Sequence, residues 1–429
     1  MGASHWFPKP NKFQYSNFMV TATIFHEWEM NFNPTLQNQA TISSSSSSNH
    51  QQHQQQEDEE SSLQEPYDQD HQSDQEKARC EWDFNLLCTI LSSNQNSSDT
   101  LGATEFDPSG HLLATAGIAR KIRIYNTTSL LASSTTTTTT HASCDYYICT
   151  PAKLSSLKWK PNSNSPTTLG SGDYDGVVTE YDLDRQIPVF ERDEHGGRRV
   201  WSIDYSSPST GVSGSDDGTM QVWDTRCTTS GGLVGLAQPS KTKSAVCCVE
   251  FSPFDGDMSV GLGCADKRAY MYDVRNFKSP ILVLSGHERT VSYVRFLGEK
   301  KLVSGGTDGF LKMWDLESGR VIRCYRGHVN RKHFVGLAVT RSGGLIACGS
   351  ESGEVFVYDE RWGEPIWVRG LSTVGDDGEI GMDGGDDERR FVGSVGWRDV
   401  GEGECTLVAG GSDGILQVFE GRKKSLASS

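Results

Sequence analysis

The stretch Ser213–Arg226, SGSDDGTMQVWDTR, decides the fold of this chain. It reads as a strand, a turn and a second strand: an Asp-Asp-Gly run at 216–218 favours the turn, and alternating apolar residues lead from it to Trp223 and Asp224. A single hairpin of this kind is only marginally stable in water. The stretch therefore predicts that related hairpins elsewhere in the chain pack beside it.

The closing pair of that stretch, an aromatic residue followed by Asp, Asn or Glu, recurs at intervals of roughly 40 to 60 residues. Its aromatic members are Tyr125, Tyr181, Trp223, Tyr272, Trp314, Tyr358 and Phe419. Six residues before the aromatic, five copies carry Asp175, Asp217, Asp266, Asp308 and Asp413, and the first and sixth carry Ala119 and Ser352. This is the WD-repeat pattern. It predicts an all-β fold, a seven-bladed WD-repeat propeller with four antiparallel strands in each blade.

Residues 1–79 differ in composition from the rest of the chain. They hold a serine run at 43–48, a Gln and His tract at 50–56 and clustered acids at 57–76. Such a segment buries too little apolar surface to offset the entropy of ordering. We expect a disordered, acidic tail over 1–79, the propeller over 80–425 and a short tail over 426–429. Residues 5–33 are rich in aromatic side chains, which favours either a docking segment or one that stays disordered or packs weakly on the propeller.

The stretch Glu81–Leu91 is a plausible strand that has no hairpin of its own, and no fourth strand follows the last copy. A propeller must close its ring, and closure removes the exposed sheet edges that would otherwise promote aggregation. We therefore expect this early strand to complete the last blade. Two insertions, at 133–141 and 375–390, read as surface loops.

Composition excludes several classes of protein. A net charge of -16 argues against wrapping nucleic acid, and no apolar run approaches the roughly 20 residues of a membrane span. The amino terminus lacks a signal peptide, so we expect a soluble, intracellular protein. Eleven cysteines without a C-x-x-C pair predict neither a zinc site nor a disulfide framework, and we expect no metal and no cofactor.

Two histidines stand at matching distances before the conserved aspartates, His195 before Asp217 and His287 before Asp308. Each pair has the chemistry of a general base and the carboxylate that orients it. Their repetition in successive blades favours a structural role instead, in which a buried carboxylate accepts a hydrogen bond from an imidazole and ties two turns together. Without a nucleophile elbow or a phosphate-binding loop, the sequence does not predict an enzyme.

The topology of a four-stranded blade places two sets of residues on one face of the ring. These are the residues just before each first strand and those beside the conserved Asp of the central turn. They are Lys153, Tyr174, Arg199, Trp201, Lys267, Arg289 and Phe334. Three aromatics and four cations on an otherwise acidic protein suit a peptide that carries apolar anchors beside carboxylates. The alternative is that the cations only solvate this face and that Trp201 belongs to the core.

Three third strands end in an aromatic-Asp-x-Arg sequence, on the opposite face of the predicted ring. These endings run from Trp223 and Asp224 to Arg226, from Tyr272 to Arg275 and from Tyr358 to Arg361. The ending resembles the box by which many WD-repeat substrate receptors dock onto the adaptor of cullin-RING ubiquitin ligases. Trp223, Asp224, Arg226 and Arg275 are the predicted adaptor-binding residues, and the alternative is that such an Arg is an ordinary surface charge.

Residues from about Ala103 to Phe419 resemble the propeller of the plant constitutive-photomorphogenic ubiquitin ligase and its phytochrome-suppressor relatives. The resemblance rests on strings that occur in order, such as LLATAGIARKIRIYN, SGDYDGVVTEYD, SGHERTVSYVRFL and RGHVNRKHFVGL. In that family the same face binds short Val-Pro peptides with acidic neighbours. The resemblance assigns this role to Lys153, Tyr174, Arg199, Trp201, Arg289 and Phe334, whereas Lys267 stands where the ligase has a histidine.

The chain lacks the ligase's RING and coiled coil, and a propeller with a short tail is similar to the plant repressor of UV-B photomorphogenesis WD-repeat family. That resemblance implies a non-enzymatic adaptor that binds the UV-B photoreceptor, promotes its return to the inactive dimer and so acts as a negative regulator. It also implies contact with the photomorphogenic ligase and a location in nucleus and cytosol. The alternative function is a substrate receptor that presents transcription regulators to a cullin-RING ligase.

Overall fold

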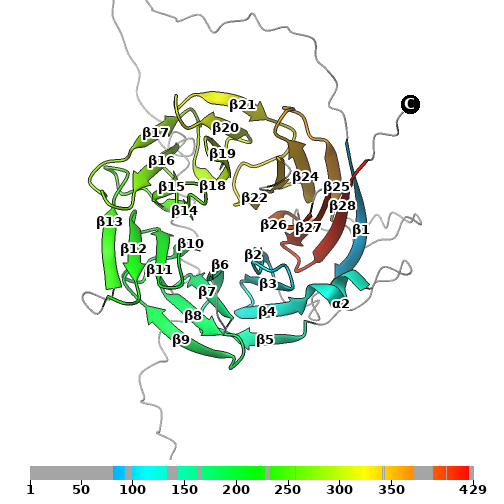
Figure 1. The fold of residues 1–429 in the computed structure, drawn as a ribbon, viewed down its shortest axis with the longest axis horizontal. Coiled ribbons are helices and arrows are strands. Elements are labelled where there is room, and N and C mark those ends of the chain that lie inside the picture. The colour runs from blue at the N-terminus through cyan, green and yellow to red at the C-terminus, as the bar shows by residue number, and fades with distance from the viewer. Residues whose placement is uncertain are drawn as a thin grey trace, which may run out of the picture. The chain divides into compact units, whose positions relative to one another are not determined.

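The computed structural model describes residues 81–91, 99–132, 144–161, 167–227, 232–256, 258–340, 342, 344–371, 390–401 and 403–424. These residues form seven four-stranded antiparallel sheets in a ring around a central axis (Figure 1). The predicted seven-bladed WD-repeat propeller is therefore confirmed. The segments predicted as tails, 1–79 and 426–429, lie outside the described residues, as does the insertion at 133–141 and all of the second insertion except Arg390.

The first three blades follow the chain in order. Blade 1 holds β2 (Leu101–Phe106), β3 (Leu112–Gly117), β4 (Lys121–Asn126) and β5 (Tyr146–Cys149). Blade 2 holds β6 (Leu154–Trp159), β7 (Thr168–Asp173), β8 (Val178–Asp182) and β9 (Ile187–Arg192). Blade 3 holds β10 (Val200–Tyr205), β11 (Thr210–Ser215), β12 (Met220–Asp224) and β13 (Leu233–Ala237).

The remaining blades continue around the ring. Blade 4 holds β14 (Val246–Phe251), β15 (Ser259–Cys264), β16 (Arg268–Asp273) and β17 (Leu282–Ser285). Blade 5 holds β18 (Val291–Gly298), β19 (Lys301–Gly306), β20 (Leu311–Asp315) and β21 (Val321–Tyr325). Blade 6 holds β22 (Leu337–Val339), β23 (Leu345–Gly349), β24 (Glu354–Asp359) and β25 (Trp367–Gly370). Blade 7 holds β26 (Val392–Gly401), β27 (Glu404–Gly411), β28 (Leu416–Lys423) and β1 (Trp82–Ile90).

Blade 7 is completed by the strand from the beginning of the propeller sequence. β1 pairs antiparallel with β28, from Trp82 opposite Lys423 to Ile90 opposite Leu416, so the expected closing strand is confirmed. The side chain of Phe84 packs tightly on this partner, because a Cβ added to Gly421 would lie 2.6 Å from its ring. The ring is thereby closed by backbone hydrogen bonds between residues far apart in the chain (Figure 1).

The apolar core lies between neighbouring blades. Ile122 and Ile124 of blade 1, for example, belong to one buried cluster with Leu157 and Trp159 of blade 2. Small residues in the second strands let the sheets approach closely. A Cβ added to Gly214 of blade 3 would lie only 2.7 Å from the Val246 side chain of blade 4, so this contact requires glycine.

Among the described residues, one helix interrupts the all-β architecture, and the sequence pattern did not predict it. α2 (Thr127–Ala132) follows β4 directly. Asn126 caps it, because its side-chain oxygen accepts hydrogen bonds from the backbone N–H groups of Thr128 and Ser129 at 2.9 and 3.3 Å. No helix in the described part of the chain is long and apolar enough to cross a membrane.

The two predicted His-Asp pairs are formed. His195 Nδ1 lies 2.8 Å from Asp217 Oδ2, and His287 Nδ1 lies 2.9 Å from Asp308 Oδ2. In blade 5 the network extends to Ser304, whose Oγ lies 2.7 Å from His287 Nε2. Each imidazole thus links the connection before a blade to the central turn of that blade, which ties together two chain segments of one face.

Two faces of the ring follow from this topology. The face that we call the top carries the connections between blades and the turns between second and third strands, and the bottom face carries the other turns. Hydrogen bonds on the top face join the two kinds of segment. Tyr174 N donates to Lys153 O at 2.9 Å, and Asp216 N donates to Arg199 O at 3.0 Å.

Candidate functional site

The position of Trp201 is set by a β-bulge. In six blades the second residue of the first strand is left out of the pairing with the second strand, which re-aims its side chain. Those residues are Gly102, Ser155, Trp201, Cys247, Ser292 and Gly393. Only Trp201 is large, so blade 3 alone uses this bulge to present an aromatic ring.

Trp201 contacts the ring of Phe334, which lies just before blade 6. The two ring centroids are 4.4 Å apart. Because blades 3 and 6 are not neighbours, these side chains can meet only near the axis of the propeller. Tyr293 of β18 joins the same group, with its ring edge toward Phe334 at a centroid distance of 6.4 Å. We call Trp201, Phe334 and Tyr293 the aromatic cluster.

Arg199 extends this surface toward blade 2. Its guanidinium carbon lies 3.8 Å from the ring centroid of Tyr174 and 4.4 Å from that of Trp201, so two aromatic faces hold it by cation–π contacts. The buried Nε atom of Arg199 has no hydrogen-bond partner within the described part of the chain. The guanidinium as a whole presents a fixed positive charge to a ligand carboxylate.

Asp216 fixes the indole of Trp201 in place. The Nε1 atom of Trp201 donates to Asp216 Oδ1 at 2.5 Å. Burial raises the pKa of the Asp216 carboxyl above its ordinary value, although the Trp201 hydrogen bond and the charge of Arg199 act in the opposite direction. The polar end of the indole is therefore satisfied within the protein, and its apolar body remains available to a partner.

Phe334 is positioned by the segment that precedes it. Three successive backbone N–H groups, those of Arg331, Lys332 and His333, donate to Glu351 Oε1 at 2.9, 2.5 and 2.6 Å. The imidazole of His333 also stacks on Phe391 of the next blade, with centroids 4.3 Å apart. Glu351 thus fixes the backbone before Phe334, and Phe391 fixes the side chain of His333. These contacts limit where the ring of Phe334 can lie.

The structure brings four of the seven predicted peptide-binding residues into direct contact, namely Tyr174, Arg199, Trp201 and Phe334. Lys153 is exposed and is joined to Tyr174 through its backbone carbonyl. Lys267 and Arg289 are exposed on the top face and make no ring contact with the aromatic cluster among the described residues. Their part in binding stays a prediction.

Sequence reasoning missed three residues that support this surface. Asp216 was assigned only to a turn, and Tyr293 and Glu351 were not singled out. The sequence does contain a signal that could have identified Asp216. This residue directly precedes the conserved Asp217 and lies opposite the bulge of the same hairpin. Tyr293 and Glu351 act on a residue of another chain segment, which no local spacing indicates.

The bottom face carries the three aromatic-Asp-x-Arg endings. Arg226 forms a two-point pair with Asp224, from Nε to Oδ1 at 3.0 Å and from Nη2 to Oδ2 at 2.6 Å. This hydrogen bonding lowers the pKa of Asp224 to about 2, so the pair is charged at neutral pH. The side chains of Arg226 and Arg275 are 75% and 68% exposed.

One predicted adaptor-binding residue needs correction. Trp223 was predicted to bind an adaptor, but its side chain is fully buried, with 0% exposure, and packs against Tyr205. It supports the bottom face and cannot touch a partner there. Arg361 differs from Arg226 because it reaches Glu81 beside the closing strand at 3.0 Å as well as Asp359 at 2.7 Å.

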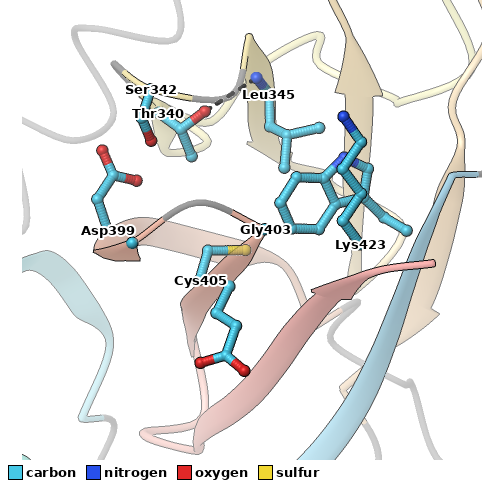
Figure 2. Close-up of a pocket in the computed structure, with 10 residues that line it drawn as sticks. Thr340, Ser342, Leu345, Asp399, Gly403, Cys405 and Lys423 are labelled. Atoms are coloured by element: carbon cyan, nitrogen blue, oxygen red, sulfur yellow. Dashed lines mark hydrogen bonds between the residues drawn. The ribbon is translucent and has the colours of Figure 1, made fainter. Parts of the chain in front are cut away.

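A cavity of about 430 Å³ lies away from the aromatic cluster, between blades 6 and 7 (Figure 2). Trp82, Thr340, Asp399, Cys405 and Lys423 are among its lining residues. In Figure 2 the hydroxyl of Thr340 accepts a hydrogen bond from the backbone of Leu345 at 2.9 Å, which closes the β22–β23 turn. None of the predicted site residues lines it, and the described residues contain no cluster of His, Cys, Asp and Glu that could hold a metal ion.

Comparison with known proteins agrees with the fold. A family model described as "WD domain, G-beta repeat" matches residues 186–224 and 278–315. The seven sheets and these matches define a WD-repeat propeller protein. The chain is 56% identical over 339 residues to the WD repeat-containing protein RUP2 of Arabidopsis thaliana, a match that covers 76% of this chain and 89% of RUP2. It is 53% identical over 349 residues to RUP1 of the same plant, which covers 80% of this chain and 86% of RUP1.

The chain therefore belongs to the RUP family of plant WD-repeat proteins, as the sequence resemblance predicted. A more distant match relates it to the E3 ubiquitin-protein ligase COP1 of Arabidopsis thaliana, at 34% identity over 328 residues. That match covers 76% of this chain but only 45% of the ligase. The protein is thus a WD-repeat regulator related to the COP1 and SPA proteins.

Proposed function

We propose that this protein is a non-enzymatic adaptor whose top face binds Val-Pro peptide motifs, and that it is a negative regulator of UV-B photoreceptor signalling. In this proposal it binds the photoreceptor's carboxy-terminal Val-Pro segment and promotes return of the photoreceptor to its inactive dimer. The observation that carries the proposal is the contiguous surface of Tyr174, Arg199, Trp201 and Phe334. Membership of the RUP family supports it.

The chemistry of the surface matches such a peptide. A Val-Pro pair offers compact apolar groups and a restricted backbone, which pack on the aromatic cluster at low entropic cost. Acidic neighbours of the pair meet the positive charge of the Arg199 guanidinium and the exposed Lys153. The anchoring aromatics supply most of the affinity, and the cations supply orientation and association rate.

The same proposal includes the photomorphogenic ubiquitin ligase as a partner and nucleus and cytosol as locations. Relatedness to COP1 and to the SPA1-related proteins supports a place in that ligase's pathway. A shared peptide-binding face would let the two propellers compete for one photoreceptor tail. Such competition removes the photoreceptor from the ligase without requiring any chemical step by this chain.

Two measurements test the proposal. Calorimetry with a synthetic photoreceptor tail peptide should show binding to the full chain, and a peptide with Ala-Ala in place of Val-Pro should not bind. In a time course by size-exclusion chromatography, UV-B-treated photoreceptor should return to the dimer faster when the full chain is present. Equal binding of both peptides would refute the Val-Pro assignment, and an unchanged rate of dimer return would refute the regulatory step.

A second function, substrate receptor of a cullin-RING ligase for transcription regulators, is favoured by the exposed pairs at Arg226 and Arg275 on adjacent blades. Reversal of both charges, Arg226→Glu with Arg275→Glu, should reduce recovery of the ligase adaptor without changing peptide affinity. Arg361→Glu is the matched control, because Arg361 is already engaged by Glu81. If the double variant recovers as much adaptor as the wild type, this second function is excluded.

A further inference from the structure

Three cations on the top face have a strained backbone. Among the described residues, four that are not glycine have a positive φ: Arg120 at 57°, Gln186 at 58°, Lys243 at 53° and Lys267 at 76°. This conformation is unfavourable for side chains other than glycine, and such strain persists where the surrounding structure imposes it. Three of the four residues carry a positive charge, and those three share one face.

The strain is specific to certain blades. The residue after the conserved Asp position is Gly176, Gly218, Gly309, Gly353 or Gly414 in five of the central turns, each with a positive φ. Blades 1 and 4 have Arg120 and Lys267 at this same position. Glycine would satisfy the turn there as it does in the other blades. The cations are therefore not required by the fold of the turn.

Lys243 reaches the same face from the connection into blade 4. A Cβ added to Gly218 would lie 2.7 Å from the backbone of Lys243, which places this connection directly against the central turn of blade 3. On the other side, Thr150 N donates to Arg120 O at 3.0 Å and begins the connection that leads to Lys153. In ring order, the cations are Arg120, Lys153, Arg199, Lys243 and Lys267, which we call the cation arc.

The cation arc contrasts with the bottom face. There Arg226, Arg275 and Arg361 each form an ion pair with an Asp two residues earlier. In the described part of the chain, the three strained cations form no ion pair, and all three are exposed. These three arginines of the bottom face are thus paired locally, whereas the three strained cations of the top face remain available to a partner.

We propose that Arg120, Lys243 and Lys267 bind the acidic segment that flanks the apolar pair of the peptide, as an extension of the site at Arg199. This inference rests on the proposed function and names the chemistry of its partner: several carboxylates in a segment that runs along the rim of blades 1 to 4. Phosphate groups would also suit cations, but the arc borders an aromatic cluster on a chain of net charge -16. An acidic protein segment is therefore the favoured partner over nucleic acid.

Glycine substitutions separate charge from strain. In the full chain, Arg120→Gly, Lys243→Gly and Lys267→Gly each remove a cation and give the backbone a residue that accepts positive φ, so folding stability should not fall. The matched control is Gln186→Gly, which relieves the same strain in the turn between β8 and β9 on the bottom face. Two synthetic peptides serve as probes, one with acidic residues beside Val-Pro and one with those residues changed to their amides.

Each cation variant should bind the acidic peptide about two- to five-fold more weakly at low salt, bind the amide peptide as the wild type does, and keep its melting temperature. Gln186→Gly should bind both peptides normally. Wild-type affinity for the acidic peptide in all three cation variants would overturn the inference and leave the proposed function intact. If the wild type binds neither peptide, both proposals fail together. If a single-stranded oligonucleotide binds the wild type but not the cation variants, the arc serves nucleic acid and the inference is wrong.

Discussion

The rings of Trp201 and Phe334 meet across the propeller axis, with centroids 4.4 Å apart, although they come from blades 3 and 6. The contact links two blades that are not neighbours in the ring. A substitution on either side therefore changes the same surface, and the affinity of a peptide for that surface reports on both residues.

Trp201→Ala should weaken binding of the Val-Pro peptide about 30-fold, because loss of a central aromatic anchor commonly costs about 2 kcal/mol or more. It removes the platform beneath Arg199 as well as the contact with Phe334. Calorimetry measures the affinity, and circular dichroism confirms the fold. Tyr147→Ala, on the outer strand β5, removes an exposed aromatic elsewhere and should leave affinity unchanged. Wild-type affinity in a folded Trp201 variant would show that the peptide binds at another place.

Glu351→Ala should reduce peptide affinity without touching the peptide. The three N–H groups before Phe334 lose their shared acceptor, which should lower the free energy of unfolding by about 1 to 2 kcal/mol and let the Phe334 ring move. Glu351→Gln keeps an acceptor oxygen at the same place and should preserve most of the affinity. Equal affinities in the two variants would show that this carboxylate does not position Phe334.

Ser304→Ala and Ser213→Ala should differ in stability, because their hydroxyls have different numbers of partners. Ser304 Oγ lies 2.7 Å from His287 Nε2 and accepts the Trp314 indole N–H at 2.7 Å. Ser213 Oγ lies 2.7 Å from His195 Nε2 and forms no second side-chain hydrogen bond within the described part of the chain. Each lost partner leaves a buried group unsatisfied at a cost of about 1 to 3 kcal/mol.

Urea unfolding of these two variants checks the difference. Ser304→Ala should lose about 1 kcal/mol more than Ser213→Ala, with the same dependence on urea in both. Each variant serves as the control for the other, because both serines are fully buried. A larger loss in Ser213→Ala would contradict the prediction.

Stability should fall in mild acid because of His328. Burial lowers the pKa of His328 from 6.5 to about 4, so the imidazole stays neutral in the folded protein while it takes up a proton in the unfolded chain. Between these two values the unfolded state binds more protons. The stabilisation is therefore complete above pH 6.5 and is lost as the pH falls toward 4, by about 3 kcal/mol in total.

Urea unfolding at a series of pH values measures this effect. His328→Gln should flatten the dependence between pH 6.5 and 4, whereas His111→Gln, at an exposed position, should leave it unchanged. His333 acts in the same direction, because burial also lowers its pKa. Asp217 and Asp308 have lowered pKa values and act mainly at lower pH, whereas the raised pKa of Asp216 acts against the His328 effect as the pH falls. An unaltered slope in His328→Gln would show that another group carries the acid sensitivity.

The fold was predictable because the repeat encodes it locally. An Asp in a turn and an aromatic residue six positions later sit on one hairpin, so their spacing survives in the sequence of each blade. The same reasoning located Tyr174, Arg199, Trp201 and Phe334 on one face. It did not show that Trp201 and Phe334 touch, because that contact depends on the diameter of the closed ring, which no residue spacing records.

Errors occurred where neighbouring context overrode a local pattern. The aromatic member of the Trp223-Asp224 pair looked available to an adaptor, yet Trp223 fills the space beside Gly211 and Tyr205 and is fully buried. The helix α2 arises from an Asn cap at the end of β4, within a sequence that otherwise reads as strands and turns. Propensity alone does not reveal either outcome.

The pairing of β1 with β28 has a consequence for synthesis of the protein on the ribosome. The closing strand emerges before all seven hairpins, and its partner emerges after them. During most of translation, the apolar side of this strand, with Trp82 and Phe84, has no partner strand. We expect chaperones to bind the nascent chain while this side is exposed. A premature stop shortly before Leu416 would remove few residues, yet it would leave both edges of the unfinished ring open.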